Sequence, residues 1–203
     1  MEEKITNHSF AILSLYRASY ASALHARAMA KKLVVSHVTL LPHLRQLEKS
    51  RILRSRKVGK NREYVLNPGN SLVKHYLAIA EELETIGYLN RNFLIKKISD
   101  SLSSLNLTGS LVLFGNYAKD YSTEASDIDL FYLGKLEQEQ SSEIRSRGKI
   151  YGKEINIKTS GMRNFQDGLR TGDTLIREVV ENHIILQNSN PLVDLVWGYY
   201  VER

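Results

Sequence analysis

Two aspartates separated by one apolar residue are the strongest candidates for chemistry in this sequence. Asp127 and Asp129 flank Ile128, a pattern that predicts a strand with both carboxylates on one face. Adjacent carboxylates repel each other, so a protein seldom places them together without a cation. Oxygen ligands of this kind suit Mg²⁺ that carries the phosphates of a nucleotide. A solvated edge strand would also show two acids to water, but the apolar flanks favour a metal–nucleotide site.

An apolar segment that ends in a glycine turn precedes the aspartates. Residues 111–114 (Leu-Val-Leu-Phe) predict a buried strand, and Gly115-Asn116 follows at its C-terminal end. Asn116 stands eleven residues before Asp127. We expect the strand to deliver this turn to the same site as the two carboxylates.

Together, residues 114–120 (FGNYAKD) and 126–130 (SDIDL) resemble the signature of the polymerase-β-type nucleotidyltransferases, particularly the small minimal members. The resemblance covers roughly residues 108–187. In that family a helix begins at a Gly-Ser pair whose amides and hydroxyl hold the triphosphate, and the D-x-D pair binds two Mg²⁺. The resemblance implies nucleotide-binding roles for Gly115, Asn116, Lys119 and Ser126, and metal-binding, catalytic roles for Asp127 and Asp129.

This sequence departs from the family pattern at three positions. Asn116 stands where Ser is usual, and Asp120 stands where Gly often follows the basic residue. The third family carboxylate lies in an apolar-acid-apolar triplet, and the best match, residues 155–157, has the neutral Asn156 at its centre. Glu154 lies two residues earlier on the same strand face, so it is our candidate for the third catalytic carboxylate.

Charge is distributed unevenly along the chain. Residues 1–70 contain 13 Lys and Arg and 4 Asp and Glu, a net charge of +9, whereas the remainder carries −3. A strongly basic segment joined to a mildly acidic one predicts a polyanion-binding module attached to a second module.

The basic segment has the pattern of three helices followed by a hairpin. Helical spacing begins at Ser9, Ser22 is placed to cap a second helix over residues 23–33, and Ser36 to cap a third with Leu40, Leu44 and Leu47 inward. Residues 52–56 and 62–66 then predict two strands.

Residues 35–40, 44–53 and 64–67 resemble the winged helix-turn-helix of repressors of the arsenic-repressor and multiple-antibiotic-repressor kind. In such domains the third helix enters the major groove of duplex DNA and the wing contacts phosphates. The resemblance implies DNA contacts by His37, Arg45, Arg54, Arg56, Lys57, Lys60 and Arg62.

A helical connector is expected between the two modules. Residues 71–87 carry apolar residues in a heptad-like stripe (Leu72, Tyr76, Ile79, Leu83 and Ile86), which predicts either packing within the chain or a homodimer. The expected class is α+β: a winged helix-turn-helix over residues 1–68, a helical connector over 69–108, and over 109–203 a nucleotidyltransferase-like mixed sheet with flanking helices.

Composition narrows the remaining classes. The chain has no cysteine, which excludes disulfides, cysteine-ligated zinc and thiol catalysis. We see no signal peptide and no apolar run of membrane-spanning length, so we expect a cytoplasmic protein without membrane contact.

Two functional classes remain open. The first is a DNA-binding enzyme that transfers a nucleoside monophosphate from an NTP to a hydroxyl with Mg²⁺. The second is a transcriptional regulator whose degenerate transferase domain binds a nucleotide or a partner. The orientation of Glu154 relative to the two aspartates discriminates between them.

Overall fold

The computed structural model describes residues 6–59 and 61–202 and contains two compact units, each described separately below. The first unit runs to Ala80 and includes the chain end from Tyr200, and the second is Glu81–Tyr199. The division falls inside helix α4 (Val73–Arg91), so the expected connector, residues 69–108, is shared between the units. Within the described ranges, no helix combines the length and apolar character needed to cross a bilayer.

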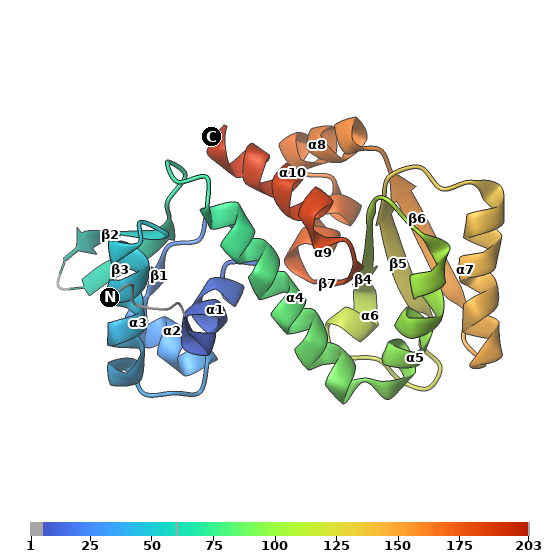
Figure 1. Cartoon of the computed structure of the whole chain (residues 1–203), viewed down its shortest axis with the longest axis horizontal. Coiled ribbons are helices and arrows are strands. Elements are labelled where there is room, and N and C mark those ends of the chain that lie inside the picture. Colours follow the sequence, from blue (N-terminus) through green and yellow to red (C-terminus); the bar gives the residue numbers. More distant parts are fainter. Residues whose placement is uncertain (1–5, 60, 203) are drawn as a thin grey trace. The chain divides into compact units, whose positions relative to one another are not determined.

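The first unit contains a small antiparallel sheet with the strand order β1-β3-β2. Its elements are α1 (Asn7–Ser14), β1 (Leu24–His25), α2 (Ala26–Lys32), α3 (His37–Lys49), β2 (Leu53–Val58) and β3 (Asn61–Leu66). Three helices followed by a hairpin agree with the sequence pattern (Figure 1). The identification of this unit as a winged helix-turn-helix domain stays a prediction.

Helix α3 begins as its sequence predicts. Ser36 Oγ accepts a hydrogen bond from the Thr39 amide at 3.2 Å, which satisfies one of the free donors of the first turn. The inward stripe is confirmed, because Leu40, Leu44 and Leu47 are fully buried.

The second helix begins later than predicted. Ser22 makes no cap, because Leu24 and His25 form strand β1, whose partners in β3 are Tyr64 and Glu63. Backbone pairing with β3 keeps these two residues extended, so α2 begins only at Ala26.

The second unit is built on a four-stranded mixed sheet with the order β6-β5-β4-β7. Strands β5 and β6 are parallel, whereas β4 is antiparallel to both β5 and β7. Besides the second part of α4, its elements are α5 (Phe93–Leu102), a 3₁₀ turn (Ser103–Leu105), β4 (Ser110–Phe114), α6 (Gly115–Ala118), β5 (Ile128–Leu133), α7 (Gln138–Ile150), β6 (Ile155–Ser160), α8 (Met162–Thr171), α9 (Thr174–Glu181), β7 (Ile184–Gln187) and α10 (Ser189–Val201). This mixed α and β architecture agrees with the expected class.

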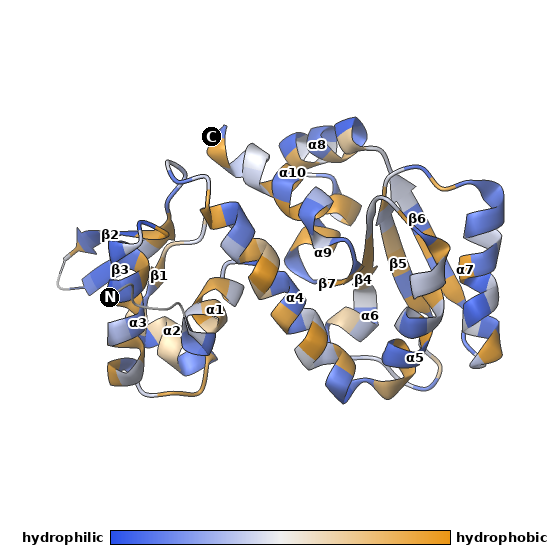
Figure 2. Cartoon of the chain, viewed as in Figure 1, coloured by the Kyte–Doolittle hydropathy of each residue, from blue (hydrophilic) through white to orange (hydrophobic). Residues whose placement is uncertain are grey.

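The two faces of this sheet carry different helices (Figure 1). Leu113 and Leu130 point to the face covered by α5 and α7, where they join one buried core with Ile98 and Ile144. The other face packs against α8 and α9. Figure 2 shows hydrophobic residues along β4 and β5 and hydrophilic residues over much of α7.

Asp129 lies on the α8 and α9 face. The β4–β5 register pairs Asp129 with Phe114, so both side chains share one face. Two residues along β5, the Phe131 ring meets the Phe165 ring of α8 with 5.6 Å between centroids. The Asp129 side chain therefore lies on the face of the sheet opposite to the α5–α7 core.

The segment between α7 and β6 differs from the sequence prediction. The sequence of residues 149–159 predicts a strand throughout, but α7 continues to Ile150 and β6 begins at Ile155. Gly148 explains the tight junction, because a Cβ there would lie 2.6 Å from Ile155 Cγ1 and 2.7 Å from the Lys153 carbonyl oxygen. Only glycine lets the last turn of α7 approach the start of β6 so closely.

The apolar stripe of α4 is exposed. Ile79, Leu83 and Ile86 are 45%, 43% and 55% exposed, whereas Leu77 and Tyr88 on the same helix are buried. Exposed apolar residues at this spacing suit a second helix. Self-association through the stripe stays a prediction.

Gly148→Ala should lower the free energy of unfolding by about 1–3 kcal/mol, because the added methyl overpacks a site bounded by backbone. Gly198→Ala in α10 is the control, because a Cβ there meets nothing within 4 Å. That control should be neutral or slightly stabilising, as is usual for replacing a helical glycine. Urea unfolding followed by circular dichroism measures both, and equal stability of the two variants would contradict the packing explanation.

Candidate active site

The two aspartates of the D-x-D motif meet an asparagine of the neighbouring strand. Asp127 precedes β5, Asp129 lies within it, and the parallel β5–β6 register places Asn156 opposite Asp129. Asn156 Nδ2 is 3.5 Å from Asp127 Oδ2 and 3.5 Å from Asp129 Oδ1. These contacts are at the outer limit for hydrogen bonds. The site therefore consists of two carboxylates and one amide.

Glu154 does not join this group. Its side chain is exposed, and its backbone oxygen accepts a hydrogen bond from the Ile128 amide at 2.9 Å. Among the described residues, no set of three acidic, histidine or cysteine side chains is arranged to hold a metal ion. Asn156, and not Glu154, is thus the side chain that contacts the aspartates, and the catalytic role of Glu154 stays a prediction.

The glycine turn after β4 lies directly against Asp129. Gly115 has φ +70°, a conformation that favours glycine, and a Cβ built there would lie 2.5 Å from Asp129 Oδ2. Helix α6 begins at this residue, as the family resemblance implies. Asn116 follows in the first turn and is exposed. The structure therefore brings Gly115 and the aspartates together.

Lys119 forms an ion pair within the protein. Its Nζ is 2.6 Å from Glu178 Oε1 of α9, and the two side chains are 30% and 39% exposed. A phosphate group would have to share or replace this partner. The ion pair fixes the end of α6 against α9 next to the aspartates.

Ser126 closes the loop that leads to Asp127. Its Oγ accepts a hydrogen bond from the Thr123 amide at 2.9 Å. Lys153 Nζ donates to the backbone oxygens of Glu124 and Ser126, in the latter case at 3.4 Å. The loop is thereby tied to the segment before β6, which limits the positions that Asp127 can take.

The Asp129 carboxyl is less acidic than an ordinary aspartate. Burial raises its pKa most, the hydrogen bond from Asn156 lowers it, and the charges of Asp127 and Glu178 raise it further. Lys158 on β6 opposes the shift. Because the pKa is raised on folding, the ionised carboxylate destabilises the fold above that pKa, and the loss is recovered as the pH falls through it.

Glu178 and Lys158 are the site neighbours that sequence analysis missed. Both act on the charge of Asp129, from α9 and from β6. Lys158 follows Asn156 by two residues, so the period of a strand could have placed it on the same face. Glu178 lies 49 positions after Asp129 in the sequence, and no local pattern connects the two.

The residues expected to contact DNA lie in the first unit, and those that the structure describes are exposed: His37, Arg45, Arg54, Arg56, Lys57 and Arg62. Lys60 lies outside the described residues. Two of the arginines have acidic partners, because Arg56 Nε is 2.9 Å from Glu63 Oε2 and Arg62 Nη1 is 3.6 Å from Glu48 Oε2.

Asp129→Asn should raise the melting temperature of the metal-free protein at pH 8 by about 1–3 °C, because it removes one of two repelling charges. The gain should shrink as the pH falls through the raised pKa of the Asp129 carboxyl, where the wild-type side chain gains its proton. Asp167→Asn, which removes an exposed carboxylate paired with Arg170 on α8, is the control and should give no gain. A lower melting temperature for Asp129→Asn would contradict the repulsion.

Residues 95–186 match the family model described as a nucleotidyltransferase domain. No curated protein and no solved structure matches the chain. The match includes the glycine turn, both aspartates, Asn156 and Glu178. The part of the second unit that builds this site is thus similar to nucleotidyltransferase domains.

Proposed function

We propose that the second unit transfers a nucleoside monophosphate from an NTP to a hydroxyl in a Mg²⁺-dependent reaction. The observation that supports this most is the convergence of Asp127, Asp129 and Asn156 beside the Gly115 turn. The similarity of residues 95–186 to nucleotidyltransferase domains points to the same reaction class.

The donor set of the site fits a divalent cation. The carboxylates of Asp127 and Asp129 lie together beside Asn156 and provide hard oxygen ligands. The long contacts from the neutral Asn156 amide do not neutralise their negative charge. The Asn156 amide can present its oxygen after rotation, because its nitrogen and oxygen are interchangeable by a flip. When bound, Mg²⁺ would supply charge neutralisation at the phosphates and a lowered pKa of the attacking hydroxyl.

The proposed reaction forms a bond between the acceptor oxygen and the α-phosphorus of the NTP. The bond from that phosphorus to the bridging oxygen breaks, and pyrophosphate leaves with the electron pair. The hydroxyl proton passes to water, because the Asn156 amide cannot accept it at neutral pH. In this proposal Asn116 and the turn at Gly115 hold the phosphates, which is supported by the exposure of Asn116 and by the close approach of Gly115 to Asp129.

A second function is favoured by one specific observation. A neutral amide occupies the third position, and Lys119 is already paired with Glu178. A domain of this kind can bind a nucleotide without turnover, and the protein would then act as a nucleotide-responsive transcriptional regulator. Asn156→Asp separates the two functions, because it restores a carboxylate that a catalytic site would use.

The first test measures binding of a non-hydrolysable NTP analogue by calorimetry with and without Mg²⁺. Wild-type protein should bind the analogue only with Mg²⁺, and the Asp127→Asn/Asp129→Asn double variant should lose this binding. Glu154→Gln is the matched control, because it neutralises an exposed acid outside the group, and its affinity should equal that of wild type. Equal affinity of wild type and double variant for the analogue would refute the metal assignment. Loss of Mg²⁺-dependent binding in Glu154→Gln would instead identify Glu154 as a ligand of the metal.

The second test measures transfer of label from an α-labelled NTP to components of a cell lysate. Asn156→Asp should raise the rate by about 10- to 100-fold if the amide limits proton removal, the lower part of the range for a general base. An Asn156→Asp variant as inactive as wild type would favour the regulator.

We propose that the first unit binds duplex DNA. Support comes from its exposed cations, since Arg45 on α3 and Arg54 and Lys57 on β2 are all exposed. Figure 2 shows that β2 and β3 are largely hydrophilic. Arg56 and Arg62 pair with Glu63 and Glu48 but remain largely exposed, so they too can reach phosphates. We expect contacts mainly to phosphates, with modest sequence preference.

Neutralising Arg54, Arg56 and Lys57 together with glutamine should weaken binding to every duplex alike. The slope of log K against log salt is negative, and each lost phosphate contact should reduce its magnitude by about 0.9. The loss of three contacts should therefore reduce it by about 3. The control is Lys97→Gln/Lys135→Gln/Arg163→Gln, which removes the same charge from exposed positions of the second unit. Fluorescence anisotropy at several salt concentrations measures both variants, and an equal slope in the two would exclude the hairpin as the contact.

A further inference from the structure

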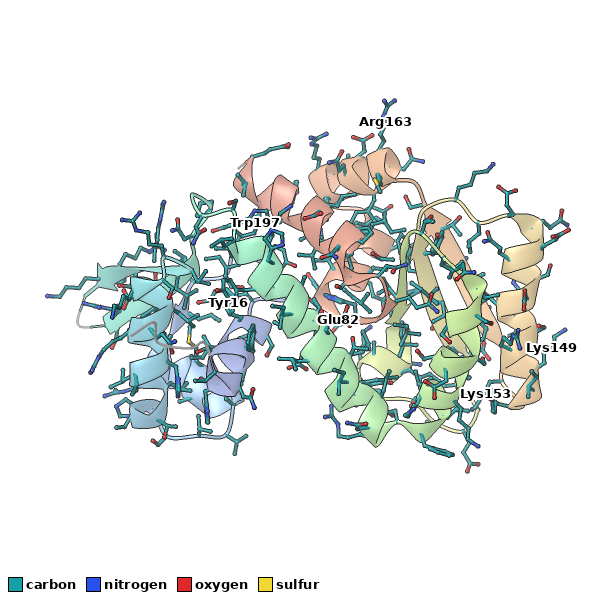
Figure 3. The ribbon with its side chains drawn as sticks, viewed as in Figure 1. Tyr16, Glu82, Lys149, Lys153, Arg163 and Trp197 are labelled. Atoms are coloured by element: carbon teal, nitrogen blue, oxygen red, sulfur yellow. The ribbon has the colours of Figure 1, made fainter. Side chains whose placement is uncertain are left out.

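A second recess lies next to the aspartates, at the junction of α7 and β6. This pocket has a volume of about 590 Å³ and is lined by Arg145, Lys149, Gly152, Lys153, Glu154, Ile155 and Asn156. Figure 3 labels Lys149 and Lys153, which lie near the same end of α7. We call these seven residues the junction pocket.

Local sequence explains how the junction pocket forms. Gly148 lets α7 end against Ile155, and the amides of Tyr151 and Lys153 both donate to the Gly148 carbonyl, at 2.9 and 3.0 Å. Gly152 has φ +66°, which turns the chain back towards β6. This turn brings cations from the helix and from the loop to one recess.

Positive charge is in excess in the lining of the junction pocket. The lining carries three cations against one carboxylate, namely Arg145, Lys149 and Lys153 against Glu154. Arg145 and Lys149 are one helical turn apart, an arrangement in which like charges destabilise a helix by about 0.2–0.5 kcal/mol. Neither side chain has an ion pair or hydrogen bond within the described parts of the chain. By contrast, Arg147 on the same helix lies 2.6 Å from Glu143. The helix dipole stabilises a cation such as Lys149 in the last turn of α7. It does not explain why a second cation, Arg145, stands one turn earlier at the same recess.

The third cation, Lys153, connects the junction pocket to the catalytic loop. Its Nζ donates to the backbone oxygens of Glu124 and Ser126, just before Asp127. Asn156 belongs to both places, because it lines the pocket and lies 3.5 Å from both aspartates. An anion bound in the pocket would therefore share one lining residue, Asn156, with the two aspartates.

The strand order separates the junction pocket from the nucleotide turn. The aspartates belong to β5, the glycine turn follows β4 on one side, and the pocket lies at β6 on the other. An in-line displacement needs the attacking and leaving oxygens on opposite sides of the phosphorus. This arrangement leaves the β6 side for the acceptor.

We propose that the junction pocket binds a phosphate group of the acceptor, with Arg145 and Lys149 as the anion-binding side chains. This inference rests on the proposed nucleotidyl transfer and names the class of its acceptor: a hydroxyl-bearing nucleotide. The volume of about 590 Å³ is that of a site for a small organic molecule and exceeds the needs of inorganic phosphate.

The test uses the full chain labelled with ¹⁵N and titrated with AMP, followed by amide chemical shifts. Signals of residues 148–156 should shift in a saturable way. Arg145→Gln/Lys149→Gln should weaken AMP binding by at least about 10-fold, since hydrogen bonds to charged groups contribute about that factor. Lys135→Gln/Arg163→Gln removes equal charge from exposed positions outside the pocket and should bind AMP as wild type does.

Three outcomes would overturn the proposal. The first is equal AMP affinity in wild type and in Arg145→Gln/Lys149→Gln. The second is a shift confined to residues 115–119, which would place AMP at the nucleotide turn. The third is inorganic phosphate binding as tightly as AMP, which would make the pocket a simple anion site.

A separate titration distinguishes failure of the acceptor proposal from failure of the proposed nucleotidyl transfer. The same labelled protein is titrated with Mg²⁺ and the non-hydrolysable NTP analogue, which should shift residues 115–119 and 127–129. Binding of both ligands at their separate positions supports the acceptor role. AMP binding without any response to the Mg²⁺–nucleotide arm would overturn the acceptor role and the transfer function, while the phosphate contacts of the pocket would stand.

Discussion

Partial burial of the Asp129 carboxylate, with the Asp127 carboxylate beside it, is the constraint on which the site of the second unit depends. Asp129 lies in β5 on the face opposite to the α5–α7 core, Asp127 lies just before the strand, and burial and the charge of Asp127 raise the Asp129 pKa. Asn156 offsets part of this energy with long hydrogen bonds, without neutralising either acid. A cation bound by both carboxylates would stabilise the fold, as any ligand that binds only the folded state does, and this connects the folding energetics of the site to its proposed ligand.

The elements around the aspartates have different packing requirements. Gly115 has no Cβ, so the turn after β4 can touch the Asp129 carboxylate, and Gly148 has none, so α7 can end against β6. The first contact lies at the proposed nucleotide side of the site, and the second borders the junction pocket.

Local patterns predicted the parts that depend on neighbouring residues. The period of two placed Asp127 and Asp129 on one face, and the Ser36 cap and the leucine stripe of α3 agree with the structure. Contacts between segments far apart in the sequence could not be predicted from local patterns. Strand β1 forms only because β3 offers Leu24 and His25 a partner, and Glu178 comes near Asp129 only through the packing of α9. The choice between Glu154 and Asn156 also depended on register, since both residues have the same parity along the strand.

The most direct measurement for the central claim is an anomalous-difference map from crystals grown with Mn²⁺ and a non-hydrolysable NTP analogue. We expect a peak about 2.1 Å from one oxygen each of Asp127 and Asp129, the distance usual for a small divalent cation with carboxylate ligands. The triphosphate should lie on the Gly115 side of that peak. A map with ordered nucleotide but no metal between the two aspartates would contradict the account.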